Sequence, residues 1–343
     1  MTSVDRRRRR SRALLAVLLA AGFAAVPAAP AAACACGGIA PLPGSEVAVG
    51  EEHAIVSWHD GVEQIDLLLA VLSADSEAGL IFPTPSPATV SLGDRADFEA
   101  LARVTTPERV EEYDWWTFQG LGDGATAGAP PEVLDVVQLG PIEATTLAAS
   151  DTAGLQAWLA GHDYALSPEV TDLLGGYVDR GWSFVALKLT GAAPLDGGLD
   201  PLRFRFASDE LVYPLELSRA ATSPQTVRLH VFAEHRQSVA FAGTATPVAS
   251  FTSWAAPVAG TEVASFGDYL TVHELYFAEP GSQILGDLTF ADAPSDATTG
   301  TTYTVSVPVG VLGIPLGWLL TVVAVVGALG ALLVASIVGA KRS

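Results

Sequence analysis

Residues 53–72 read HAIVSWHDGVEQIDLLLAVL, and this stretch predicts a β-hairpin. Two strand-like runs, 53–58 and 62–72, flank the dipeptide Asp60-Gly61. Asp and Gly adopt the backbone angles that a tight hairpin turn requires, so the two runs are expected to pair as antiparallel strands. The hairpin therefore indicates an antiparallel sheet.

Further strands are expected on the C-terminal side of this hairpin. Residues 80–82 form a short apolar run that Pro83 ends. Residues 182–190 alternate, so that their even-numbered side chains share one face of a strand. The other strand-like runs are 133–139 and 142–147, which we expect to pair across Gly140-Pro141, then 202–206, 212–217 and 226–234, while 269–277 fits either a helix or a strand.

Helical segments lie between these runs. Ser167-Pro168 can begin a helix that runs to residue 178, because proline suits the first helical position. Asp151 can cap another helix, which Gly161 ends. Two more helices are expected over 94–104 and 107–116. Because helices and strands follow no regular βαβ alternation, the predicted fold class is α+β, mainly antiparallel sheet with a few helices, plus one C-terminal transmembrane helix.

The N-terminus has the three-part pattern of an export signal. A strongly basic segment from Arg6 to Arg12 precedes the apolar stretch 13–26, which is too short for a stable membrane anchor. Small residues follow, and the A-x-A pattern allows cleavage after residue 31, 33 or 35. We therefore expect residues 1–33 to be a signal peptide that is cleaved near residues 31–35.

The C-terminus has the pattern of a single membrane span. Residues 309–340 carry no charge, and a helix over Trp318–Val338 would cover roughly 32 Å, close to a hydrocarbon core of about 30 Å. Lys341 and Arg342 follow at once, and the positive-inside rule places them in the cytoplasm. We expect an extracytoplasmic α+β domain over 34–290, a Ser/Thr-rich stalk over 291–308, a transmembrane helix over 309–340 and a short cytoplasmic tail over 341–343. The protein would then lie in the cell membrane with its large domain outside.

Small residues recur along the predicted span. Gly327, Ala331, Ala335 and Gly339 are spaced by four positions and share one helix stripe. Small residues let two membrane helices approach closely, so this stripe could support self-association. The alternative is chance, because the segment is rich in Ala and Gly.

The charge balance argues against nucleic acid as a partner. The predicted mature domain has 10 basic and 37 acidic residues, a net charge of −27. Such a surface repels nucleic acid and anionic lipid head groups. It favours cations or basic partners, although solubility outside the cell explains the same composition.

Cysteine usage is sparse. Cys34 and Cys36 are the only two cysteines, and both lie at the predicted new N-terminus. A disulfide between residues i and i+2 is possible but strained. The two cysteines are therefore expected either as such a disulfide or as free thiols. Cleavage after residue 35 would leave Cys36 alone. Lipidation of Cys34 is a further reading, but Ala31 stands where a leucine is normally found.

Sequence motifs for catalysis or metal binding are missing. His273-Glu274 lacks the second histidine of a zinc-protease helix, and neither a G-x-S-x-G elbow nor a phosphate-binding glycine loop occurs. The six histidines are scattered without ligand spacing. The sequence predicts no metal site and no cofactor, and it leans away from an enzyme. A catalytic triad assembled from distant residues stays open, because triads are recognised by geometry.

Lys188 is the sharpest candidate for a binding residue. It is the only lysine of the predicted domain, and its strand face also carries Trp182. Partial desolvation there could lower its pKa and suit amine chemistry or anion capture. A cation that stacks on tryptophan or lies at the sheet rim is the favoured alternative. With Tyr177, these residues form the candidate binding set, although Tyr177 and Trp182, together with Trp158 and Tyr164, fit core packing better.

Several segments resemble one bacterial family, catalogued as domain of unknown function 2330. The resemblance covers most of the chain from Cys36 to about Glu234. It implies an exported or membrane-anchored envelope protein and no established activity. Family members often carry another cysteine shortly after Cys-Gly-Gly, where this chain has Ile39-Ala40-Pro41, which puts any family disulfide there in doubt. The segments that carry the resemblance are 35–38, 80–85, 155–159, 181–189 and 211–215, with Tyr164 and Tyr177.

The sequence leaves three functions open. The first is a non-enzymatic cell-envelope module that binds a partner protein, a glycan or a cell-wall component and is held by a single-pass anchor. The second is a surface hydrolase with an unrecognised site. The third is a subunit of a membrane-associated assembly that is coupled through the small-residue stripe of its span.

Overall fold

The computed structural model describes most of the predicted domain and the C-terminal helix. The described residues are 38–42, 45, 47–114, 136–137, 143–147, 152–164, 166–191, 195–242, 248–300, 302–311 and 314–340. The predicted signal peptide, Cys34, Cys36 and the tail over 341–343 lie outside the described residues.

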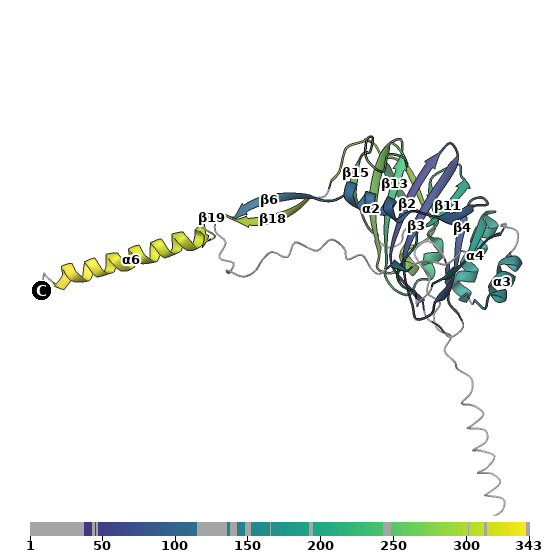
Figure 1. Ribbon diagram of the computed structural model, residues 1–343, viewed down its shortest axis with the longest axis horizontal. Coiled ribbons are helices and arrows are strands. Elements are labelled where there is room, and N and C mark those ends of the chain that lie inside the picture. Colours follow the sequence, from purple (N-terminus) through teal and green to yellow (C-terminus); the bar gives the residue numbers. More distant parts are fainter. Residues whose placement is uncertain are drawn as a thin grey trace, which may run out of the picture.

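A nine-stranded sheet forms the centre of the molecule (Figure 1). Its strands run in the order β15-β16-β13-β2-β3-β10-β7, and β11 pairs with both β3 and β5. Most of these pairs are antiparallel; β13 with β2 and β10 with β7 are parallel. The strands are β2 (Val47–His59), β3 (Val62–Ser73), β5 (Thr89–Leu92), β7 (Val136–Val137), β10 (Asp196–Leu199), β11 (Leu202–Ala207), β13 (Gln225–Ala233), β15 (Ala249–Pro257) and β16 (Tyr269–Phe277).

The predicted hairpin is confirmed as strands β2 and β3. His59 and Val62 close the ladder, and between them Asp60 and Gly61 have φ values of 51° and 75°. Positive φ at both central residues is the geometry that favours Asp-Gly in a two-residue turn. The turn therefore fixes the register of the two strands at the centre of the sheet.

A four-stranded antiparallel sheet packs against the nine-stranded sheet. Its order is β1-β4-β9-β8, and Phe82 on β4 stacks on Phe204 of β11 with ring centroids 4.1 Å apart. The alternation of β9 is confirmed, because Val185 and Leu187 join the core between the sheets while Phe184 packs with the helices. The elements of this layer are β1 (Gly38–Ala40), β4 (Glu77–Thr84), β8 (Glu143–Leu147), β9 (Ser183–Thr190), α3 (Thr152–Gly161) and α4 (Pro168–Asp179).

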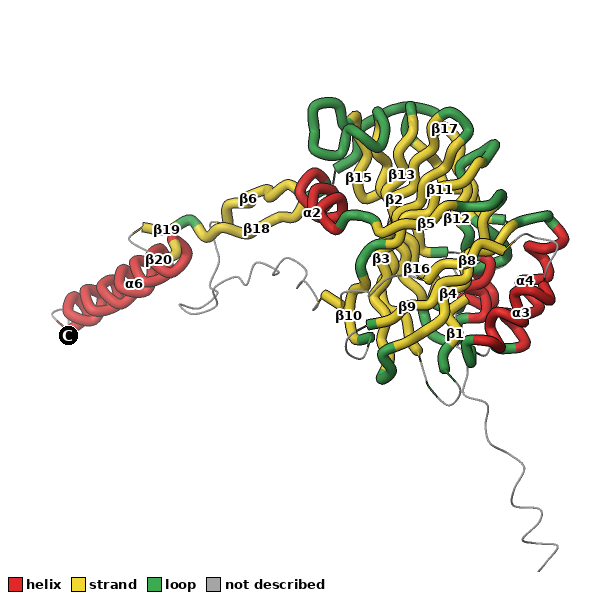
Figure 2. The backbone as a smooth tube through the Cα atoms, turned by 45° about the vertical axis from the view of Figure 1, so that its right-hand side comes forward, coloured by secondary structure: helices red, strands yellow, loops and turns green. Residues whose placement is uncertain are grey.

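Smaller elements complete the body. Strands β12 (Val212–Tyr213), β17 (Leu288–Asp292) and β14 (Gln237–Phe241) form a three-stranded sheet. Helix α2 (Arg95–Val104) covers part of the nine-stranded sheet, and Figure 2 shows α3 and α4 together beside the four-stranded sheet. The short helices are η1 (Glu216–Ala220) and α5 (Pro280–Gln283). The fold class is therefore α+β with mainly antiparallel sheet, as predicted.

Local predictions are wrong at four places. Strand β4 continues through Pro83 to Thr84, and the strand predicted over 212–217 stops at Tyr213, because η1 begins at Glu216. Residues 107–116 are not a helix: β6 (Glu108–Asp114) is a strand that pairs in parallel with β18 (Thr302–Pro308). Strand β6 is stabilised by backbone hydrogen bonds to β18, which lies far along the chain. The residue pattern within 107–116 gives no sign of that pairing. The runs around Gly140-Pro141 do form strands, but β7 joins the nine-stranded sheet and β8 joins the four-stranded one. The ambiguous run 269–277 is strand β16.

The β6–β18 pair leads from the body to the C-terminal helix (Figure 1). Strand β18 lies within the segment that the sequence predicts as a stalk, and the short strands β19 (Gly310–Val311) and β20 (Ile314–Pro315) follow it. Helix α6 (Leu316–Ala340) is apolar and is not covered by other parts of the described chain. Within the described residues, Leu316–Ile337 is the one segment long and apolar enough to cross a membrane, which suggests a membrane anchor.

Candidate functional site

A row of polar side chains crosses three neighbouring strands near the hairpin turn. Ser57 on β2 lies opposite Gln64 on β3, and Gln64 lies opposite Arg205 on β11. Directly opposed residues in a sheet point to the same face, so these three side chains share one surface. Residues of the other parity, such as Ile65 and Phe204, are fully buried in the core between the sheets.

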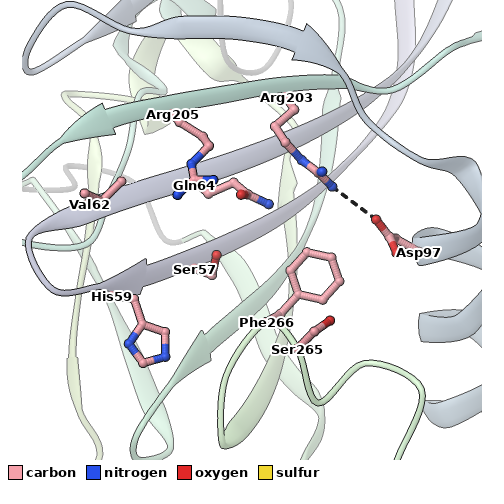
Figure 3. Close-up of a pocket in the computed structure, with 9 residues that line it drawn as sticks. All are labelled: Ser57, His59, Val62, Gln64, Asp97, Arg203, Arg205, Ser265 and Phe266. Atoms are coloured by element: carbon pink, nitrogen blue, oxygen red, sulfur yellow. Dashed lines mark hydrogen bonds and ion pairs between the residues drawn. The ribbon is translucent and has the colours of Figure 1, made fainter.

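The same sheet face is covered further from the turn. There, Phe98 and Leu101 of α2 pack with Ile55, and Val263 from the β15–β16 loop joins them. Helix α2 and this loop do not cover the row of polar side chains, and a pocket of about 430 Å³ lies over it. The pocket is lined by Ser57, His59, Val62, Gln64, Asp97, Arg203, Arg205, Ser265 and Phe266 (Figure 3). Its volume falls within the usual range for small-ligand sites, although its lining is unusually polar.

Two carboxylates hold Arg203, one of the residues that line the pocket. Its Nε donates to Asp66 Oδ1 at 2.8 Å, and its Nη2 donates to Asp97 Oδ2 at 3.1 Å. The hydrogen bond with Asp66 raises the pKa of Arg203, and partial burial raises the pKa of Asp97. Because Asp66 is fully buried, its pairing with Arg203 is a structural requirement. Arg203 therefore has little capacity left for a ligand.

Arg205 is in the opposite situation. Its side chain is exposed, and no ion-pair partner for its guanidinium lies among the residues that the structure describes. A guanidinium presents five N–H donors in a planar fork that matches carboxylate geometry. Gln64, Ser57 and Ser265 add neutral hydrogen-bonding groups, and Phe266 adds an apolar wall. The arrangement can bind an anionic group on a polar ligand.

The lining does not assemble a nucleophile and base. Within the described part of the chain, no hydrogen bond joins the hydroxyl of Ser57 or Ser265 to the ring of His59. Such a bond is the geometric sign of nucleophilic catalysis. The described residues also contain no group of three His, Cys, Asp or Glu that could hold a metal ion.

Tyr177 and Trp182, two of the three predicted binding residues, do lie together. Their ring centroids are 5.1 Å apart, and Arg180 lies over both rings, with its Cζ at 4.3 Å and 5.4 Å from the two centroids. The Tyr177 hydroxyl donates to Asp287, and burial raises the pKa of Tyr177 well above its usual value. Asp287 Oδ1 also accepts from the backbone N–H groups of Leu215 at 2.8 Å and Glu216 at 3.0 Å.

Lys188, the third predicted binding residue, is paired with a carboxylate. Its Nζ lies 3.1 Å from Glu77 Oε2, and the two side chains are 28% and 34% exposed. Glu77 belongs to β4, the neighbour of β9 in the four-stranded sheet. Lys188 therefore sits in a partly exposed ion pair across two strands. Neither Lys188 nor Glu77 lines the polar pocket.

Trp158 in helix α3 packs against Tyr164, which follows the helix. Trp158 stacks on His162 at 4.3 Å and on Tyr164 at 6.0 Å between ring centroids. Tyr164 is buried and belongs to the same core cluster as Tyr177. These aromatic residues are part of the helix–sheet packing.

The polar pocket was not predicted from the sequence. One signal was present: Arg203 and Arg205 alternate with Leu202, Phe204 and Phe206, which puts two cations on one strand face. A strand face with two arginines in a strongly acidic protein marks a place where anions can bind.

The fold and the pocket define a class of protein: a mainly antiparallel α+β protein with a polar surface pocket and one helix able to cross a membrane. The bacterial family described as uncharacterized protein conserved in bacteria, domain of unknown function 2330, matches residues 30–291. The chain belongs to this family, which confirms the resemblance found in the sequence.

Other comparisons give no closer relationship. No curated protein matches the sequence. Among solved structures, baculovirus P35 aligns with 9% identity and a TM-score of 0.34, over 75% of this chain and 97% of P35. A mutated baculovirus P35 after caspase cleavage aligns with 9% identity and a TM-score of 0.31, over 74% of this chain and 100% of that one. Similarity at this level supports no conclusion about this chain.

Proposed function

We propose that the protein is a cell-envelope binding module, exported by its N-terminal signal and held by the single-pass anchor α6. The body would lie outside the cell and the C-terminus in the cytoplasm. Support comes from the basic–apolar–small order of residues 1–33, the apolar length of α6 and the basic pair Lys341-Arg342.

The ligand of this module binds in the polar pocket through an anionic group. One observation carries this step: Arg205 lines the pocket and lacks an ion-pair partner among the described residues, whereas Arg203 beside it is held by Asp66 and Asp97. Gln64, Ser57 and Ser265 supply donors and acceptors for amides or hydroxyls. The shared ligand chemistry is a carboxylate on a hydrogen-bonding scaffold, which either a peptide or an acidic sugar provides.

Topology is tested on whole cells. A reporter fused after residue 343 should be active only in the cytoplasm, and added protease should digest the body. Protection of the body from protease would contradict the proposed orientation.

Ligand binding is tested with two matched probe pairs. The full chain in lipid nanodiscs is titrated with N-acetyl-tetraglycine and its C-terminal amide, and with glucuronate and glucose. In at least one pair the carboxylate form should bind about tenfold tighter, and Arg205→Gln should remove that difference. Arg219→Gln is the control, because Arg219 is an exposed arginine at η1 outside the pocket lining. Equal binding within both pairs, or an unchanged preference in Arg205→Gln, would contradict the proposal.

A further inference from the structure

The floor of the polar pocket contains a serine hydroxyl that is almost fully buried. Ser57 is 8% exposed, and it lines the pocket. Within the described part of the chain, no hydrogen bond involves its side-chain oxygen. Buried polar side chains are nearly always hydrogen-bonded, so a group that enters the pocket is expected to pair with this hydroxyl.

Gln64 has the same property on the neighbouring strand. Its side chain is half-buried in the pocket lining, and none of the described residues forms a hydrogen bond with its amide. It lies between Ser57 on β2 and Arg205 on β11 (Figure 3). Neighbouring strands are about 4.8 Å apart, so these three residues form a row roughly 10 Å long. The row offers an amide, a hydroxyl and a guanidinium to one ligand.

On this floor, only side chains are available to a ligand. The backbone of Ser57 pairs with Phe232 and Gln64, and the backbone of Arg205 pairs with Gln64 and Thr89. All three strands are therefore interior strands at these positions. Strand addition, by which a sheet recognises the backbone of an extended peptide, requires a free strand edge. The floor is thus unsuited to an extended peptide.

The side chains around the row suit a ring that carries hydroxyl groups. A serine hydroxyl and a glutamine amide both donate and accept hydrogen bonds, as ligand hydroxyls do. Asp97 adds an acceptor, because its Oδ2 accepts from Arg203 at 3.1 Å whereas no hydrogen bond from the described residues reaches its Oδ1. Phe266 adds an aromatic ring to the lining, and the C–H face of a sugar ring can pack against it.

We infer that the ligand is an acidic sugar, a hexuronate unit of a glycan, with its carboxylate at Arg205 and its ring hydroxyls at Gln64 and Ser57. Asp97 Oδ1 accepts from a further hydroxyl, and Phe266 packs against the sugar ring. This inference rests on the proposed binding function and extends it by choosing the sugar over the peptide as the ligand class.

The test uses three carboxylates that differ in their other groups. Glucuronate has the carboxylate and the ring hydroxyls, tetrahydropyran-2-carboxylate keeps only the ring and the carboxylate, and N-acetyl-tetraglycine is the peptide probe. The dissociation constant of each, and of glucose, is measured with the full chain in lipid nanodiscs. Glucuronate should bind about tenfold tighter than either other carboxylate, because these leave the hydroxyl and amide groups of the pocket unpaired.

Two variants remove hydrogen-bonding groups of the row and keep Arg205. Ser57→Ala and Gln64→Met should each lower the affinity ratio of glucuronate to tetrahydropyran-2-carboxylate about fivefold, while the ratio of glucuronate to glucose stays high. Ser183→Ala is the matched control, because Ser183 is a buried serine on β9 outside the pocket lining, and it should change neither ratio. Thermal unfolding of each variant checks that folding is retained.

The outcomes separate the inference from the proposed function. Equal binding of glucuronate and tetrahydropyran-2-carboxylate, or tighter binding of the peptide probe, would overturn the sugar inference. The anion site would still stand if Arg205→Gln weakened binding of the tightest carboxylate. Loss of any Arg205 dependence would overturn both. An unchanged ratio of glucuronate to tetrahydropyran-2-carboxylate in both Ser57→Ala and Gln64→Met would show that the hydroxyls bind elsewhere and would also overturn the inference.

Discussion

The helix-covered side of the four-stranded sheet and the hairpin end of the nine-stranded sheet both carry aromatic and charged residues. On the helix side, the Tyr177 hydroxyl bonds to Asp287, and Arg180 is bonded to Glu216 at 2.8 Å while it lies over Tyr177. At the hairpin end, Arg205 lines an open pocket without an ion-pair partner among the described residues. The charged and aromatic groups of the helix side are therefore bonded to one another, whereas the guanidinium of Arg205 is available to a ligand.

The largest effect on stability should come from removing the carboxylate of Asp287 on the helix-covered side. Its Oδ1 accepts from Tyr177 and from the backbone N–H groups of Leu215 and Glu216. Asp287→Ala leaves these buried donors unpaired, so the free energy of unfolding should fall by about 3 kcal/mol or more. Urea unfolding of the full chain in detergent, followed by tryptophan fluorescence, measures it. A loss below about 1 kcal/mol would mean that this network is not structural.

Acid pH should lower the stability of the protein through two buried histidines. Desolvation lowers the pKa of His273 to about 4 and that of His230 to about 3. The unfolded chain therefore binds more protons than the folded chain below about pH 6.5, and this contribution to stability is lost as pH falls from about 6.5 towards 4 and 3.

The pH effect is best measured as a difference between His273→Gln and the unaltered protein, because burial raises the pKa of Glu63 and acts in the opposite sense. Between pH 6 and pH 5, removing His273 should reduce the slope of the unfolding free energy by up to about 1.4 kcal/mol per pH unit. Equal slopes in the two proteins would contradict the assignment.

A smaller effect is expected from Tyr177→Phe. The ring stays in the core with Trp182 and Phe184, and only the hydroxyl hydrogen bond to Asp287 is lost. The free energy of unfolding should fall by about 1 kcal/mol, and ligand affinity should not change. Loss of binding with intact stability would instead show that Tyr177 contacts the ligand, the alternative to core packing for this residue.

The smallest effect on stability should come from Lys188→Gln and Arg205→Gln. Lys188 has one partly exposed partner, Glu77, and pairs of this kind contribute about 0–1 kcal/mol. Arg205 has no such pair in the described part of the chain, so its change should stay within about 0.5 kcal/mol. The same urea titration measures both. A loss above about 2 kcal/mol for Arg205→Gln would show that its side chain is structural.

Local patterns were enough to predict much of the fold. The Asp60-Gly61 turn, the alternation of β9 and the start of α4 all depend on neighbours in the sequence, and Ser167 Oγ indeed accepts from the Val170 N–H at 3.2 Å. Strand β6 was missed because its partner β18 lies far along the chain.

The pocket could not be predicted for the same physical reason. Gln64 and Arg205 become neighbours only through the register of β3 with β11, and Phe266 reaches them from a loop after β15. Which arginine is available depends on where Asp66 and Asp97 lie, since the two arginines are alike in the sequence. For Tyr177 and Trp182 the sequence favoured core packing over ligand binding, and in the structure Tyr177 is buried with Trp182 packed against the same cluster.

The most direct test of the hairpin-end site is one binding measurement on matched cation variants. The dissociation constant of the carboxylate probe that binds tighter, N-acetyl-tetraglycine or glucuronate, is determined for the full chain in nanodiscs, unaltered and with Arg205→Gln or Lys188→Gln. Arg205→Gln should weaken binding about tenfold, and Lys188→Gln should leave it within about twofold. Weaker binding in Lys188→Gln with no change in Arg205→Gln would contradict the assignment of the site to the hairpin end.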